Sequence, residues 1–171
     1  MIEVKNIKKV FGDKTIIEDV SSVMKAGQCN LIIGASGSGK TVLMKCMVGL
    51  FEPNEGEVLY SGESFTAMTG SDKTEIRKQI GMLFQGSALF DSQTVEQNVM
   101  FPLNMFTKDS YKEKLRRVNE VLERVNLVGA NKKFPSEVSG GMKKRVALAR
   151  AIVLNPKYLF CDEPNYGIDS Q

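Results

Sequence analysis

The sequence predicts an α/β fold, and three observations support this prediction. The apolar run Cys29–Ile33 stops at a glycine-rich loop, Gly34–Gly39, and helix-compatible residues follow from Lys40 to Leu50. A buried strand, a glycine turn and a helix in this order begin a βα unit. A second apolar run, Tyr158–Cys161, predicts another short buried strand. With 42% apolar residues among 171, the chain can bury one hydrophobic core, so we expect a single domain.

The chain is expected to open with two strands joined by a turn. Strand-like residues occupy Ile2–Val4 and Thr15–Met24, and the turn Gly12–Lys14 separates them. Two further strands are expected over Glu57–Tyr60 and Ile80–Phe84.

Two helices are expected in the second half of the chain. The first covers Tyr111–Leu127, and the second runs from about residue 139 to 154, with Pro156 as a stop signal. Apolar residues recur at helical spacing in both, at Tyr111, Leu115, Val118, Leu122 and Val125 and at Met142, Val146, Ala149 and Val153. We therefore expect a helical insertion between roughly residues 95 and 134.

The composition excludes several classes of protein and site. The net charge is only +3 and no long basic block is present, so we expect no nucleic-acid partner. No apolar run approaches the roughly 18 residues that a membrane helix needs. Met1–Lys9 mixes charged with aliphatic residues, which is unlike a signal peptide. The chain has no histidine, so it cannot contain a histidine triad or a histidine metal site.

The cysteines suggest a reducing environment. Cys29, Cys46 and Cys161 are an odd number and lack the spacing of metal ligands. We expect all three to be small buried hydrophobic residues.

The glycine-rich loop is the strongest single motif. It matches G-x-x-x-x-G-K-[ST] at every fixed position with the residues Gly34, Ala35, Ser36, Gly37, Ser38, Gly39, Lys40 and Thr41. Glycines allow backbone N–H groups to surround a phosphate, and the following helix presents its positive end to it. We expect Lys40 to reach the β- and γ-phosphates and Thr41 to bind Mg²⁺. A chance glycine turn is the alternative, but the predicted strand before the loop and the helix after it favour phosphate binding.

An acidic pair, Asp162 and Glu163, follows the predicted strand Tyr158–Cys161. Carboxyl ends of parallel strands line the ligand crevice of an α/β sheet. We expect Asp162 to hold Mg²⁺, usually through a water, and Glu163 to orient or deprotonate the attacking water. An ordinary acidic strand end is the alternative for this pair alone.

The stretch between these motifs resembles the ABC ATPases. Val138–Met142 and the helix after it resemble the family's signature motif, and Gln85 resembles its Q-loop glutamine. Phe11 resembles the aromatic residue that stacks on adenine, and Gly167–Asp169 resembles most of the D-loop. The motifs occur in the family's order and span essentially the whole chain.

The resemblance implies a P-loop NTPase (RecA-like) core with an N-terminal antiparallel β part and an inserted helical subdomain. It implies a nucleotide-binding core over 1–92, a helical subdomain over 93–135, and the signature helix, Walker B strand and D-loop over 136–171. It also implies that Lys40, Gln85 and Glu163 act in catalysis and that Gln85 helps to bind Mg²⁺. Ser139, Gly140 and Gly141 would hold the γ-phosphate of an ATP bound to a second subunit, in a head-to-tail dimer.

The chain departs from the family pattern in several places. Val138 and Met142 stand where the family usually has Leu and Gln, and Tyr166 stands at the usual serine of the D-loop. The family continues beyond the position of Gln171 to a switch histidine, so the resemblance implies a truncated ATP-binding subunit of low activity. Its expected partner is an integral-membrane transporter subunit, and its expected location is the cytoplasm, at the inner membrane.

The residues after Gln85 narrow the subtype. The segment 84–99, with Phe101–Leu103 after it, closely resembles the Mce/Mla-type ATPases of bacterial lipid transport, which also favour a methionine at the position of Met142. This implies phospholipid transport. A non-transport ABC ATPase, a P-loop phosphotransferase and a fragment that only binds nucleotide remain as alternatives.

Overall fold

The computed structural model describes residues 1–162 and divides the chain into two compact units. The first unit covers Met1–Arg77, and the second begins at Lys78. Within the part of the chain that the structure describes, no helix has the length and apolar character needed to cross a membrane.

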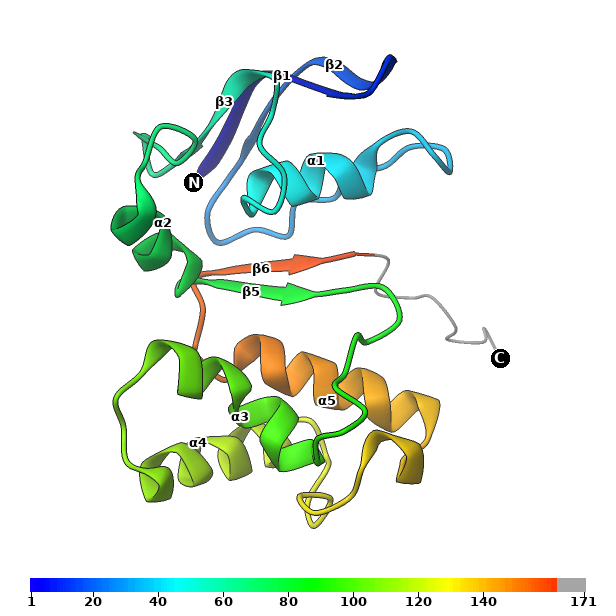
Figure 1. Cartoon of the computed structure of the whole chain (residues 1–171), viewed down its shortest axis with the longest axis vertical. Coiled ribbons are helices and arrows are strands. Elements are labelled where there is room, and N and C mark those ends of the chain that lie inside the picture. The colour runs from blue at the N-terminus through cyan, green and yellow to red at the C-terminus, as the bar shows by residue number, and fades with distance from the viewer. Residues whose placement is uncertain (163–171) are drawn as a thin grey trace. The chain divides into compact units, whose positions relative to one another are not determined.

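The first unit is built on an antiparallel sheet, as the sequence predicts (Figure 1). Its order is β2-β1-β3-β4, in which β1 (Ile2–Phe11) and β2 (Lys14–Met24) form a long hairpin. The strand β3 (Glu55–Tyr60) pairs with β1 on its other side, and the short β4 (Glu63–Ser64) pairs with β3.

Two helices complete the first unit. The helix α1 (Lys40–Met47) follows the glycine-rich loop, and α2 (Gly70–Arg77) ends the unit. The core between sheet and α1 is apolar and contains Val4, Ile7, Met47, Val58 and Phe65, each at most 1% exposed. Tyr60 joins them because its hydroxyl donates to the carbonyl of Met47 at 2.9 Å.

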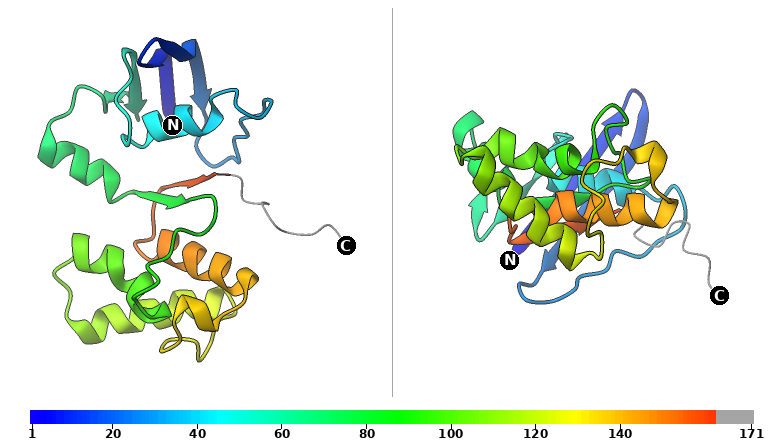
Figure 2. Two further views of the ribbon diagram at one scale, coloured as in Figure 1. Left: turned by 45° about the vertical axis from the view of Figure 1, so that its right-hand side comes forward. Right: turned by 90° about the horizontal axis from the view of Figure 1, so that it is seen from below.

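The second unit combines a parallel strand pair with a helical layer (Figure 2). The strands β5 (Ile80–Leu83) and β6 (Tyr158–Cys161) run in parallel. Between them the chain forms α3 (Val95–Phe106), α4 (Tyr111–Arg124), a short 3₁₀ turn (Pro135–Glu137) and α5 (Gly140–Ile152). The predicted helical insertion is confirmed.

The hydrophobic core of the second unit contains most of the apolar residues that recur at helical spacing in the sequence. Val118, Leu122 and Val146 are fully or almost fully buried and lie in one cluster with Val99 and Leu103 of α3. Tyr111 is the exception, because its ring is 60% exposed and only its hydroxyl reaches inward, to Glu96.

The predicted strand before the glycine loop is wrong. Residues 29–33 form no regular structure, and Leu31 and Ile33 are 78% and 83% exposed. A strand needs a neighbour to bind its backbone N–H and C=O groups. In both sheets formed by residues 1–162, every pairing partner lies elsewhere in the chain.

Two further burial predictions are wrong. β6 is not a buried strand, because Leu159 is 47% exposed and the residues along it alternate between exposed and half-buried. Of the cysteines, only Cys46 is buried, whereas Cys29 and Cys161 are exposed. Burial raises the pKa of the Cys46 thiol, which keeps it protonated and unreactive.

Candidate functional site

The glycine loop of the first unit adopts a conformation that only glycine accommodates easily. Gly37 and Gly39 have φ angles of 77° and 92°, in the left-handed region. A Cβ atom on Gly39 would also lie 3.0 Å from the carbonyl oxygen of Ile16 in β2. The loop therefore turns tightly against β2 and delivers the chain directly into α1, with Gly39 as the N-cap residue.

The side chain of Lys40 lies along this loop. Its Nζ atom donates to the carbonyl oxygens of Gly34 at 2.7 Å and of Ala35 at 2.8 Å. Thr41 follows it on the first turn of α1. The Lys40 cation is thus held beside the backbone of the glycine loop.

Phe11 lies at the end of β1, in the same unit. Its ring contacts Phe51 edge-on, with centroids 5.3 Å apart, and is 43% exposed. Lys9 Nζ lies 5.0 Å from its centroid. The ring therefore has a packed edge and open surface on which a planar group could stack.

In the second unit, Gln85 and Asp162 belong to the same edge of the strand pair. Leu83 pairs with Cys161 at the carboxyl ends of β5 and β6, and the Asp162 amide donates to the Leu83 carbonyl at 2.9 Å. Gln85 is exposed just beyond β5, whereas Asp162 is buried. The structure thus brings these two residues to one edge of the strand pair. Glu163 and the D-loop residues Gly167–Asp169 lie outside the described residues.

The loop after Gln85 is fixed from two helices. Arg150 of α5 donates to the carbonyl oxygens of Ser87 at 3.0 Å and of Ala88 at 2.9 Å. Asn98 of α3 is fully buried and binds both the amide and the carbonyl of Phe90. Sequence reasoning missed both residues. The only available signal was a polar residue at an apolar position of each helix.

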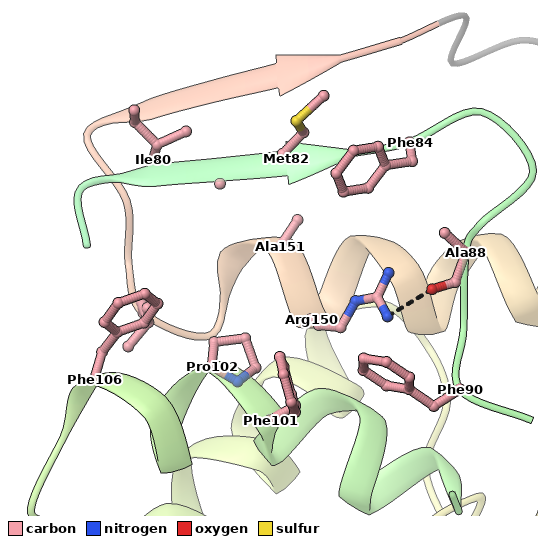
Figure 3. A pocket seen from close by; sticks show the side chains of 12 residues that line it. Ile80, Met82, Phe84, Ala88, Phe90, Phe101, Pro102, Phe106, Arg150 and Ala151 are labelled. Carbon is pink, nitrogen blue, oxygen red and sulfur yellow. Dashed lines mark hydrogen bonds between the residues drawn. The ribbon is translucent and has the colours of Figure 1, made fainter. Parts of the chain in front are cut away.

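A pocket of about 270 Å³ lies within the second unit, beside this loop. It opens between β5, α3 and α5, and Figure 3 shows Phe84, Phe90, Phe101 and Phe106 around it. Arg150 lines it as well, and burial lowers the pKa of this guanidinium.

The predicted signature residues lie at the start of α5. Ser139 is the N-cap, and its hydroxyl accepts a hydrogen bond from the Met142 amide at 3.2 Å. Gly140 and Gly141 are the first residues of the helix, and both are exposed. Backbone N–H groups at the N-terminus of a helix carry a partial positive charge and can bind an anion. Arg150 comes about three turns later, so roughly 16 Å of helix separates Ser139 from the residue that contacts the loop after Gln85.

Each unit carries oxygen atoms of the kind that Mg²⁺ prefers. Thr41 of the first unit has a hydroxyl, and in the second unit Gln85 has an amide oxygen and Asp162 a carboxylate. Within the glycine loop, a Cβ atom on Gly34 would lie 2.7 Å from Ser38 Oγ, so the loop closes too tightly there for a side chain. Within residues 1–162, no group of three or more histidine, cysteine, aspartate or glutamate side chains is placed to hold a metal ion.

Comparisons with known proteins identify the family of this chain. The profile of the ABC transporter family matches residues 17–166. The probable ribonucleotide transport ATP-binding protein mkl of Mycobacterium leprae is 44% identical over 98% of this chain and 48% of its own length. The methionine import ATP-binding protein MetN of Escherichia coli K12 is 45% identical over 99% of this chain and 50% of its own length. The chain thus spans about half the length of these curated relatives.

Solved structures show the same fold. A dimeric ATP-binding cassette in a post-hydrolysis state, bound to ADP and Pi, superposes with a TM-score of 0.89 at 31% identity, covering 99% of this chain and 77% of that one. A second dimeric cassette, from a bacterial ABC transporter, gives 0.90 at 32% identity, covering 99% of this chain and 76% of that one. Because the family profile covers well over half of the sequence, the chain belongs to the ABC transporter family of ATP-binding cassettes, which have the P-loop NTPase fold.

Proposed function

We propose that this protein is the ATP-binding and ATP-hydrolysing subunit of an ABC transporter. The observation that carries the proposal is the glycine loop, in which two left-handed glycines and the Lys40 cation form a cradle at the start of α1. Stabilising charge on a transferring phosphoryl group is the main task of such a site.

The proposed roles follow from the chemistry of each group. Lys40 donates to the β- and γ-phosphates, and Thr41, Gln85 and Asp162 supply oxygen ligands for Mg²⁺, which neutralises phosphate charge when bound. Glu163 orients or deprotonates the attacking water. Phe11 stacks on the adenine through its open surface. Gly34–Gly39 bind phosphate through backbone N–H groups.

The subunit is proposed to act as a head-to-tail dimer. The start of α5, with Ser139, Gly140 and Gly141, would bind the γ-phosphate of the ATP held by its partner. The exposure of both glycines at the N-terminus of α5 supports this proposal. The dimeric state of the two similar cassettes also supports it.

A membrane subunit is the proposed second partner. The helical insertion of 93–135 would dock on it, and the loop after Gln85 would report the state of the γ-phosphate to that interface. The protein would then lie at the cytoplasmic face of the inner membrane. In the proposed domain organisation, residues 1–92 are the nucleotide-binding core. Residues 136–171 contain the signature helix, the Walker B strand and the D-loop.

The proposed cargo is a phospholipid or another lipid. The support is the sequence of 84–103, which resembles lipid-transport ATPases. A polar solute is the second candidate, because the similar proteins are named for ribonucleotide transport and methionine import.

Binding of a fluorescent ATP analogue with Mg²⁺ tests the nucleotide site. We expect Lys40→Ala to weaken binding by at least tenfold, since the triphosphate loses a charge-assisted partner. Lys25→Ala, which changes an exposed lysine of the same unit, is the matched control and should bind like the wild type. Equal affinity of the two variants would refute the site.

The cargo is tested on the complex of this subunit with its co-purified membrane partner. In liposomes, phospholipid should stimulate ATP hydrolysis, and Lys40→Ala should abolish the stimulation. Stimulation by a ribonucleotide or methionine instead would replace lipid with a polar cargo.

A further inference from the structure

The backbone directly after Gln85 is unusual. Gly86, Ser87 and Ala88 have φ angles of 76°, 70° and 45°, so three successive residues are left-handed. Glycine adopts this conformation freely, but Ser87 and Ala88 carry Cβ atoms that disfavour it. A run of this kind persists only where the surroundings fix it. The loop therefore needs an external restraint to keep its shape.

Arg150 supplies contacts of the required kind. Its two terminal nitrogens donate separately to the carbonyl oxygens of Ser87 and Ala88, at 3.0 and 2.9 Å. Figure 3 shows the guanidinium reaching from α5 to Ala88 beside the ring of Phe90. Its central carbon lies 5.8 Å from that ring's centroid. A planar fork can bind two adjacent carbonyls at once, whereas a lysine ammonium would hold them as a point charge.

The contact joins two elements that the proposed function uses. On one side, Gln85 immediately precedes the left-handed run. On the other, Arg150 belongs to the helix that begins at Ser139. That helix is anchored in the core through Val146 and Ala149, both fully buried, so it offers a rigid support.

We propose that Arg150 is a positioning residue for Gln85. By holding the carbonyls of Ser87 and Ala88, it keeps the left-handed run in place and so fixes the direction in which Gln85 leaves β5. This inference rests on the proposed function, in which Gln85 responds to the γ-phosphate. Arg150 itself makes no proposed contact with nucleotide.

The experiment compares affinities for a triphosphate and a diphosphate. Mg²⁺ with fluorescent AMP-PNP or with fluorescent ADP is titrated into the wild type, Gln85→Ala, Arg150→Met and the double variant. Because the proposed role of Gln85 includes a response to the γ-phosphate, which ADP lacks, Gln85→Ala should lower the preference for AMP-PNP over ADP by fivefold or more. Arg150→Met should lower it by a similar factor. The double variant should lose no more than Gln85→Ala alone, since both changes remove one function.

Two controls separate positioning from general stability. Arg145→Met makes the same change at an exposed position of α5, where the guanidinium contacts the Asn126 carbonyl, and should keep the preference within twofold. Hydrogen exchange read by mass spectrometry should show amides 86–90 exchanging at least tenfold faster in Arg150→Met. Amides 142–149 should be unchanged. If Arg150→Met does not fold, Arg150→Lys is measured instead. A decrease of at least twofold in its preference for AMP-PNP over ADP supports the proposal, and a smaller decrease contradicts it.

The outcomes distinguish this inference from the function beneath it. Loss of preference in Gln85→Ala but not in the Arg150 variants would overturn the inference alone. So would additive losses in the double variant. If the wild type binds neither nucleotide, or Gln85→Ala has no effect, the proposed function fails and the inference fails with it.

Discussion

Asn98 and Phe90 form a reciprocal pair of hydrogen bonds across eight residues of the second unit. The Phe90 amide donates to Asn98 Oδ1 at 2.9 Å, and Asn98 Nδ2 donates to the Phe90 carbonyl at 3.1 Å. The same Nδ2 lies within 3.0 Å of the carbonyls of Gln93 and Thr94. One fully buried amide thus ties the loop after Gln85 to α3.

This pair predicts a large loss of stability in Asn98→Leu. The substitution keeps the volume but leaves the partly buried Phe90 N–H and several carbonyls without their partner, which costs about 2–4 kcal/mol. Urea unfolding followed by circular dichroism measures it. Asn104→Leu, at an exposed position of the same helix, should change the unfolding free energy by less than about 0.5 kcal/mol. Similar losses in both variants would contradict the assigned role of Asn98.

The two left-handed glycines of the phosphate loop should respond differently to alanine. At Gly37 nothing lies within 4 Å of an added Cβ. Alanine there is therefore disfavoured only by the left-handed backbone conformation, which costs about 1 kcal/mol of folding free energy. At Gly39 the Cβ also lies 3.0 Å from the Ile16 carbonyl and 3.2 Å from Ile17. We therefore expect Gly39→Ala to weaken Mg-ATP binding clearly more than Gly37→Ala in parallel titrations. The reverse order would show that the loop binds nucleotide in another shape.

Phe11→Ala should separate binding of the base from binding of the phosphates. Stacking of a base on an aromatic ring is worth about 1–3 kcal/mol, so ATP affinity should fall by about tenfold. Tripolyphosphate has no base, and its affinity, measured by competition, should stay within twofold. Phe11→Tyr keeps the ring and should restore ATP binding. Equal losses for both ligands would mean that Phe11 only supports Phe51.

Glu96 should make the second unit sensitive to acid. Burial raises the pKa of this carboxyl, but hydrogen bonds from Tyr111, Asn131 and Lys132 outweigh it and the net pKa is lowered from 4.5. A carboxyl with a lowered folded-state pKa stabilises the protein above its unfolded value and loses this contribution as the pH falls further. The stabilisation should therefore be complete above about pH 4.5 and decline below it.

The matched variants for this effect are Glu96→Gln and Glu123→Gln. At pH 7 the first should cost about 1–2 kcal/mol, because charge-assisted hydrogen bonds are lost. The second changes an exposed glutamate of α4 and should cost little. Urea titrations between pH 3 and 7 should show the Glu96→Gln difference shrinking toward the acid end. A difference that is constant with pH would rule out this carboxyl as the cause.

The sequence predicts those parts of the structure that local chemistry determines. The glycine loop was recognisable because left-handed residues and a close backbone approach require glycine at Gly37 and Gly39. α4 and α5 were recognisable because their apolar stripes face one core. By contrast, α2 has no buried residue among those described and so gives no periodic pattern. α3 does have buried residues, but the polar Asn98 and the helix-breaking Pro102 lie among them, so its sequence does not show a regular apolar pattern.

The errors concern residues whose environment depends on distant partners. The apolar run 29–33 reads as a strand, yet strand formation depends on a neighbour that the run itself cannot specify. Arg150 reads as one basic residue among several on α5. Its importance emerges only when the loop after Gln85 is seen to present two carbonyls to it. A single sequence records such long-range pairings poorly.

The parallel pair of β5 and β6 has a consequence for the order of folding. Ile80 pairs with Tyr158 across a stretch of chain that contains α3, α4 and α5. Closing so long a loop is entropically costly, whereas the helices form from local contacts. We therefore expect the helices to pack first and to shorten the effective distance before the strands meet. The sheet edge with Gln85 and Asp162 should then form only after the helical layer of the second unit has folded.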